Sequence, residues 1–225
     1  MDKIKADKTT QEEAEEEKDR KSLKQRVFSS ESAYSAVLNK IADIVVIHFM
    51  VLLFSVPIVT AGAAITAGNY TCMKLAGGME GYVTSNFMKA FKENFKRSTL
   101  YFFVMALSGA ILYISLRYWF YQKSAIGLLF GIFSVVLVIV WMMIFLYLFG
   151  VQAKFENTFM ATLKNSLLMA VRHLHITILM VLVLAVFTYF VISFPLFQVI
   201  SAVSGIGILL FIFGKLYNIV FRHYM

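Results

Sequence analysis

The residues best suited to chemistry lie between Phe54 and Tyr82, where polar and backbone-active residues interrupt an apolar sequence. The candidate residues are Pro57, Thr60, Gly62, Thr66, Asn69 and Glu80. Proline and glycine favour interrupted helices, and unwound backbone at membrane depth is a common binding-site feature of transporters. Neighbouring hydroxyl and amide groups can hydrogen-bond a polar ligand. We therefore expect either a ligand-binding motif or a close helix-packing motif here.

Elsewhere the sequence offers little for catalysis or metal binding. It has no H-E-x-x-H, G-x-S-x-G or Walker motif, and Cys72 is its one cysteine. His48 is the only ionisable residue deep in an apolar segment, and we expect it to hydrogen-bond to a neighbouring helix. Arg172, His173 and His175 are interpreted as interfacial anchors rather than metal ligands. We expect no enzymatic activity, no cofactor and no metal.

The composition indicates a membrane protein. Of the 225 residues, 60% are hydrophobic and 15% are charged, whereas soluble domains average about 45–50% and about 25%. Ten of the thirteen acidic residues lie at or before Asp43, while basic residues continue to Arg222. The net charge of +8 is therefore typical of positively flanked membrane helices and does not indicate a nucleic-acid partner.

The order of apolar and charged segments predicts an all-α fold, a polytopic helical bundle of about six membrane segments. Residues 1–30 are expected to be a charged, disordered cytosolic tail, because they have almost nothing to bury. Residues 31–225 are expected to form a single membrane domain, and no cleavable signal peptide is expected before it. The expected spans are about 41–57, 62–76, 99–116, 125–149, 176–194 and 197–214.

The second of these spans is short because Pro57 breaks the apolar run before it. Fourteen residues, from Ala63 to Ala76, are too few for an ordinary span, so the segment is either a short crossing or a re-entrant segment. Amphipathic approach helices are expected at 83–98 and 154–175, each before a hairpin of two spans. Their similarity fits either internal duplication or convergence on one amphipathic pattern.

The lysine and arginine distribution favours a full crossing by this short segment. If it crosses, nineteen basic residues lie on the cytoplasmic side and two, in the 117–123 link, lie outside. If it does not cross, the basic 69–98 segment lies on the outer side of the membrane, and the orientation of every later segment is reversed. We therefore predict six segments with both termini cytoplasmic.

Several ordered motifs resemble the YesL family of bacterial membrane proteins over about residues 30–215. The matching segments are Leu38-Asn39-Lys40-Ile41-Ala42-Asp43, Pro57-Ile58-Val59-Thr60-Ala61-Gly62-Ala63, Glu80-Gly81-Tyr82, Phe91-Lys92-Glu93-Asn94-Phe95-Lys96, Leu163-Lys164-Asn165 and Arg172-His173-Leu174. The resemblance implies a domain of unknown function, often encoded beside carbohydrate ABC importers and glycan-degrading enzymes. It implies no catalytic residues.

Two functions are consistent with these features. The first is an accessory component of carbohydrate (ABC-type) uptake in the bacterial cytoplasmic membrane, acting through helix contacts. Its expected partners are the lipid bilayer and either such an importer or a second copy of the chain. The alternative is an autonomous small-solute transporter or channel whose path is lined by the broken segment 54–82.

Overall fold

The computed structural model of the protein describes residues 34–79 and 82–224. All regular elements in these two ranges are helices. Five described helices are long and apolar enough to cross a membrane. They are Tyr34–Ser55, Val83–Tyr121, Ala125–Lys154, Leu174–Ser193 and Pro195–Phe221. The predicted all-α, polytopic fold class is confirmed. The tail expected at residues 1–30 lies outside the described residues.

The chain divides into two units, Met1–Ala42 and Asp43–Met225. The described part of the first unit is helical and exposes the apolar side chains Tyr34, Val37, Leu38 and Ile41. The remaining description concerns the second unit, which contains the rest of the first helix up to Ser55 and every later element.

A short break separates the first helix from α2. The residue before a proline is disfavoured in the helical conformation, and the first helix ends at Ser55, ahead of Pro57. The 3-10 helix η1, Ile58–Thr60, follows, and α2, Ala61–Ala76, is then fully helical. The break is therefore confined to the residues around Pro57. The 16 residues of α2 make it about 24 Å long at 1.5 Å per residue, which is shorter than a typical hydrocarbon core.

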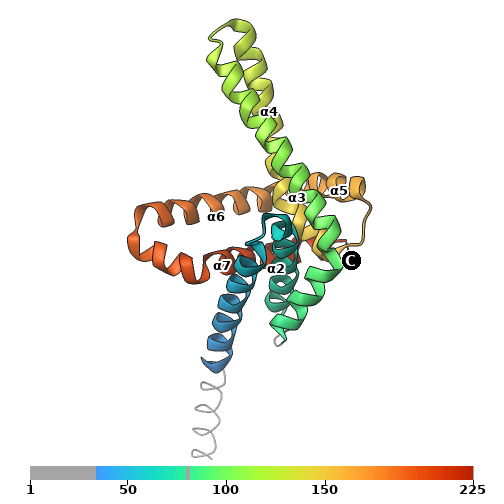
Figure 1. The fold of residues 1–225 in the computed structure, drawn as a ribbon, viewed down its shortest axis with the longest axis vertical. Coiled ribbons are helices and arrows are strands. Elements are labelled where there is room, and N and C mark those ends of the chain that lie inside the picture. The colour runs from blue at the N-terminus through green and yellow to red at the C-terminus, as the bar shows by residue number, and fades with distance from the viewer. Residues whose placement is uncertain (1–33, 80–81, 225) are drawn as a thin grey trace, which may run out of the picture. The chain divides into compact units, whose positions relative to one another are not determined.

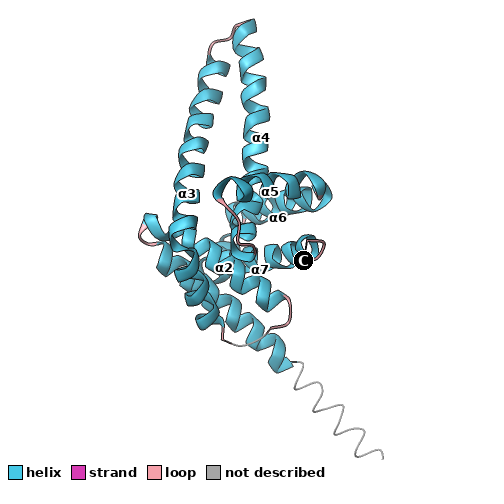
Figure 2. Cartoon of the chain, turned by 90° about the vertical axis from the view of Figure 1, so that its right-hand side faces the viewer, coloured by secondary structure: helices cyan, strands magenta, loops and turns pink. Residues whose placement is uncertain are grey.

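The helices α3, Val83–Tyr121, and α4, Ala125–Lys154, form a long hairpin (Figure 2). The boundary expected at Thr99 is not a helix end, because no proline or glycine interrupts the stretch from Val83 to Ser108. The amphipathic stretch 83–98 is thus the first part of α3 and not a separate approach helix. At the other end, the Ser124 hydroxyl caps α4 by accepting a hydrogen bond from the Gly127 N–H at 3.0 Å.

The second half of the chain contains α5, Phe159–Arg172, followed by the hairpin of α6, Leu174–Ser193, and α7, Pro195–Phe221. Pro195 occupies the first turn of α7, where its missing N–H group breaks no helical hydrogen bond. Figure 1 shows the α3–α4 and α6–α7 hairpins leaving the region of α2 in different directions.

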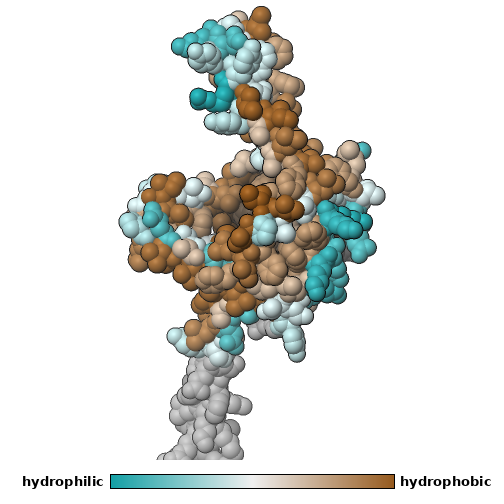
Figure 3. Space-filling view, in the orientation of Figure 1, coloured by the Kyte–Doolittle hydropathy of each residue, from teal (hydrophilic) through white to brown (hydrophobic). Residues whose placement is uncertain are grey.

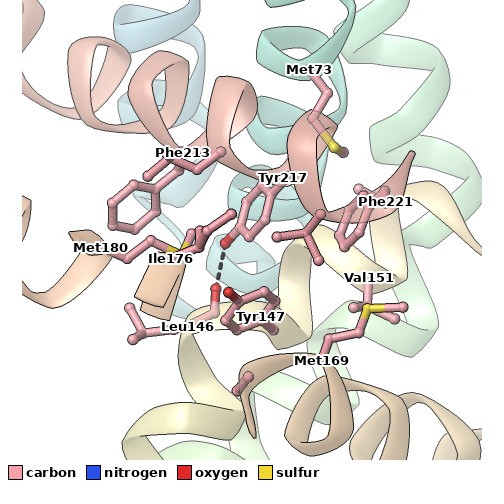
Figure 4. Close-up of a cluster of buried hydrophobic side chains, with 14 residues drawn as sticks. Met73, Leu146, Tyr147, Val151, Met169, Ile176, Met180, Phe213, Tyr217 and Phe221 are labelled. Atoms are coloured by element: carbon pink, nitrogen blue, oxygen red, sulfur yellow. Dashed lines mark hydrogen bonds between the residues drawn. The ribbon is translucent and has the colours of Figure 1, made fainter. Parts of the chain in front are cut away.

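The buried core surrounds α2, which contacts α3, α4 and α7. Eleven of its 16 residues are buried. The largest cluster joins Met73 of α2 to side chains of α4, α5, α6 and α7. At its centre the Tyr217 hydroxyl donates a hydrogen bond to the Leu146 carbonyl oxygen (Figure 4). The tyrosine ring also fills the space above Gly150, where a Cβ would lie 2.8 Å from it.

The surface of the hairpins is largely apolar. In the space-filling view, hydrophobic residues cover most of the hairpin surfaces, and hydrophilic residues gather at the tip of the α3–α4 hairpin (Figure 3). The exposed side chains on α3 and α4 include Leu107, Ile111, Leu129, Phe133 and Val136. An apolar band ending in a polar tip is the surface expected of helices that cross a bilayer.

Candidate functional site

Thr60 closes the break between the first helix and α2. Its hydroxyl lies 2.7 Å from the Pro57 carbonyl oxygen and also reaches the carbonyl oxygen of Phe54. Phe54 lies in the last turn of the first helix, where carbonyl groups lack an intrahelical partner. By donating to these carbonyls, the Thr60 hydroxyl caps the helix end. Pro57 is extended and leads the chain into η1.

Gly62 lies at a close approach between α2 and α3. A Cβ at this position would overlap the Ser98 carbonyl oxygen and would lie 2.7 Å from the Phe102 Cβ. Small residues allow membrane helices to approach closely and so increase their packing contact. Gly62 is therefore required for packing, which is one of the two roles expected of it.

Thr66 connects the same two helices one turn further along α2. Its hydroxyl lies 2.9 Å from the Gly62 carbonyl oxygen and 2.8 Å from the Ser98 hydroxyl oxygen. Thr66 and Ser98 are both fully buried. This contact is an interhelical hydrogen bond of the kind that holds membrane helices together.

Asn69 is buried but only partly satisfied. Its amide nitrogen donates to the Ile65 carbonyl oxygen at 3.0 Å, while its side-chain oxygen has no hydrogen-bond partner in the chain. An unsatisfied buried acceptor costs about 1–3 kcal/mol. A donor from outside the chain, such as water or a ligand group, would remove that cost.

A second buried amide shares this property. The Gln152 side chain of α4 donates to the Asn94 side-chain oxygen of α3 at 2.8 Å, yet its own oxygen has no partner in the chain. The Asn94 amide nitrogen donates to the Ala90 carbonyl oxygen at 3.0 Å. Sequence reasoning missed Gln152 and Asn94, because their pairing depends on how α3 and α4 align.

The helix alignment places the three amides at one level. The α2 and α3 helices run antiparallel, with Thr66 bonded to Ser98 and Lys74 bonded to Asn86. This register brings Asn69 level with Asn94, to which Gln152 is bonded. Gly62, Thr66 and Asn69 follow one another at four- and three-residue spacing, so they share a helix face. We call Asn69, Asn94 and Gln152 the amide layer.

The six predicted residues therefore fall into three groups. Pro57 and Thr60 form the break, and Gly62, Thr66 and Asn69 lie on the α2 face that meets α3. Glu80 lies outside the described residues. The structure gives all of the described members except Asn69 a packing or capping role, and Asn69 alone leaves a polar atom unpaired.

His48 has a role that its sequence position only partly indicated. The Ile206 N–H donates to Nδ1 of His48 at 3.2 Å, so the proton of the neutral ring lies on Nε2, which is 2.9 Å from the Ala202 carbonyl oxygen. These two backbone groups are the i and i+4 partners of one α7 turn. The expected hydrogen bond to a neighbouring helix is confirmed, and it engages both backbone groups.

Gly207 makes the approach of His48 feasible. A Cβ there would overlap the Ile44 carbonyl oxygen and would lie 3.2 Å from the His48 Cβ. Because the backbones meet so closely, the imidazole can reach the α7 backbone itself. The glycine in α7 was visible in the sequence, but its pairing with His48, more than 150 residues earlier, was not.

Part of the chain matches the model of a protein family. Neither curated proteins nor solved structures returned a similar chain. The matched residues begin in the first helix and continue through α2 and most of α3, so they include His48, the break, and both Asn69 and Asn94 of the amide layer. Over residues 42–116 the chain matches the model of a family described as a protein of unknown function, DUF624.

Proposed function

We propose that this multi-pass membrane protein is a non-enzymatic accessory component of carbohydrate (ABC-type) uptake in the bacterial cytoplasmic membrane. Two lines of support combine. The YesL resemblance implies a protein that is often encoded beside such importers. In addition, the candidate residues Thr60, Gly62 and Thr66 make their contacts within the chain, which suits a scaffold that acts through its surface.

The observation that carries the proposal is the packing of α2 at the centre of the core. Gly62 abuts the α3 backbone, and Gly214 of α7 abuts the α2 backbone, where a Cβ would lie 2.9 Å from the Cys72 carbonyl carbon. A segment packed backbone to backbone on two sides is suited to fixing the outer helices in place. The outer helices then present surfaces to a partner.

The basic first part of α3 is the surface we assign to that partner. Lys89, Lys92, Lys96 and Arg97 are exposed on α3. The positive-inside distribution predicts that they face the cytoplasm. A basic helix face in the cytosol can contact the cytoplasmic surface of an importer. Helix faces that lie in the bilayer cannot make that contact.

Mild crosslinking followed by affinity purification from the native membrane tests the proposal. We expect importer subunits among the crosslinked proteins, and we expect K92E/K96E to reduce their recovery severalfold. The matched control is R117E/K123E, which reverses two charges at the other end of the α3–α4 hairpin. Recovery of no importer subunit with the unaltered chain would remove the support for an uptake role.

The amide layer favours a second candidate, an autonomous small-solute transporter. The unpaired oxygens of Asn69 and Gln152 are acceptors that a polyhydroxylated solute could satisfy. Proteoliposomes containing only this protein test the idea. Sugar flux that is lost in N69L/Q152L and retained in the T71V control would favour transport, and an absence of flux in the unaltered protein would exclude it.

A further inference from the structure

We propose that a phosphate-bearing anion, the headgroup of an anionic phospholipid, binds a basic cluster where α5, α6 and the end of α7 meet. The cluster consists of Arg172, His173, His175, His223 and Tyr224, and the exposed Arg222 directly precedes His223 in the chain. The proposal is independent of the uptake role.

Three elements converge on the imidazole of His173. Its ring centroid lies 6.1 Å from that of His175 and 5.6 Å from that of His223. The Tyr224 hydroxyl oxygen lies 3.3 Å from Nε2 of His173, and the Arg172 guanidinium carbon lies 5.7 Å from the Tyr224 ring centroid. Residues some fifty positions apart thus form one group, which no local sequence pattern indicates.

The cluster carries positive charge without a described counterion. Among the residues that the structure describes, no acidic side chain forms an ion pair with a cluster member. The pKa of His173 is lowered, first by burial and then by the neighbouring His223, His175 and Arg172. Among the described residues, the neighbouring charges that lower this pKa are all basic. An anion bound among them would remove the repulsion and favour protonation of His173.

The donor set fits phosphate better than a metal ion. Guanidinium, imidazolium and phenol groups all donate hydrogen bonds, and phosphate oxygens accept them. Within the described ranges, no group of three or more His, Cys, Asp or Glu side chains is arranged to hold a metal ion. Neighbouring basic side chains that repel one another are suited to binding an anion.

The position of the cluster points to a lipid as the source of the phosphate. The apolar helix α6 begins at Leu174, and the apolar helix α7 ends at Phe221. The cluster thus lies at the ends of two candidate spans, the depth at which headgroups are found. Beside it, Leu168, Val171, Leu174 and Ile178 are each more than half exposed. These side chains form an apolar strip that acyl chains can cover while the headgroup contacts the basic residues.

Lipid titration of the full chain in neutral detergent tests this proposal. Dihexanoyl-phosphatidylglycerol is added at several pH values, and histidine NMR follows the pKa of His173. We expect saturable binding that raises this pKa, and we expect binding to be tighter at pH 5.5 than at pH 8, by at most about tenfold for each pKa unit of the rise. Dihexanoyl-phosphatidylcholine should leave the pKa unchanged.

Inorganic phosphate and two sets of variants complete the test. We expect inorganic phosphate to bind at least tenfold more weakly, since it lacks acyl chains. R172Q/R222Q should abolish the response, and R117Q/K123Q, which removes two positive charges at the hairpin tip, should retain it. If the first variant does not fold, H173Q provides the test, because it should weaken the pH dependence of binding that His173 contributes. Equal binding of inorganic phosphate would overturn the assignment of the ligand as a lipid. The site itself would be overturned if neither anion bound, or if the cluster variants responded as the unaltered chain does.

Discussion

His48 accepts a hydrogen bond from the backbone N–H of Ile206 at 3.2 Å, through the Nδ1 atom of its imidazole. The other ring nitrogen contacts the carbonyl oxygen of Ala202, one turn earlier in α7. A single side chain therefore binds both polar groups of one helix turn. This contact joins the first helix to the last helix of the chain, and it specifies the neutral imidazole with its proton on Nε2.

Replacing His48 with leucine should weaken the attachment of the first helix to α7. H48L removes both hydrogen bonds while keeping a similar volume, so we expect the free energy of unfolding to fall by about 1–2 kcal/mol. Unfolding in mixed dodecyl maltoside and SDS micelles, followed by circular dichroism, measures this change. The L129A variant, at an exposed position of α4, is the control and should remain within about 0.5 kcal/mol. Equal stabilities of H48L and the unaltered chain would contradict the assigned role.

Gly62→Ala should separate α2 from α3. The added methyl group would overlap the Ser98 carbonyl oxygen, a backbone atom that cannot rotate away. We expect a loss of about 1–3 kcal/mol, the usual cost of overpacking. Ala110→Val adds carbon atoms at an exposed position of α3 and should be nearly neutral. Thermal unfolding of the three proteins in one detergent provides the comparison, and a G62A protein as stable as A110V would be inconsistent with close packing at this point.

Thr66 and Ser98 should be energetically coupled. T66V keeps the side-chain shape but removes the donor, and we expect a loss of about 0.5–1.5 kcal/mol. A double-mutant cycle with S98A should show a coupling energy of about 0.6 kcal/mol, the average for hydrogen bonds between membrane helices. The Thr71 hydroxyl donates to the Ala67 carbonyl oxygen within α2. The cycle of T71V with S98A should therefore show no coupling, and equal coupling in the two cycles would contradict the interhelical bond.

The predicted topology can be tested with single cysteines. Cys72 is buried, so C72A provides a background without reactive thiols. Ser85, at the start of α3, and Ser124, before α4, are both exposed. In intact bacterial cells we expect a membrane-impermeant maleimide to label S124C and not S85C, and to label both after the cells are opened. Labelling of S85C in intact cells would mean that α2 does not cross the membrane.

The stability of the protein should depend on pH through His173. Its pKa is lowered in the folded chain, so the unfolded chain binds more protons between that value and the ordinary pKa of about 6.5. Stability should therefore be greatest above about pH 6.5 and should decrease as the pH falls toward the folded-state pKa. Unfolding in neutral detergent between pH 5 and 8 measures this dependence. H173Q should reduce this dependence.

Local sequence features determined the membrane character and most helix boundaries. The apolar runs predict the long helices, because a bilayer-spanning segment must satisfy its backbone internally. Pro57 and Pro195 marked a break and a turn, because proline lacks an N–H group and restricts the residue before it. The boundary at Thr99 was misplaced because amphipathicity changes there while the helical backbone continues without interruption.

The tertiary structure decided what each polar residue contacts. Thr66, Asn69 and His48 have comparable apolar surroundings in the sequence, yet one bonds across to α3, one leaves an oxygen unpaired and one binds the α7 backbone. Those outcomes depend on helix register and on glycines that permit close approach between segments far apart in the chain. The convergence of Arg172, His173 and His223 has the same origin. The type of a residue determines which hydrogen bonds it can form, but only the packing of the helices determines its partner.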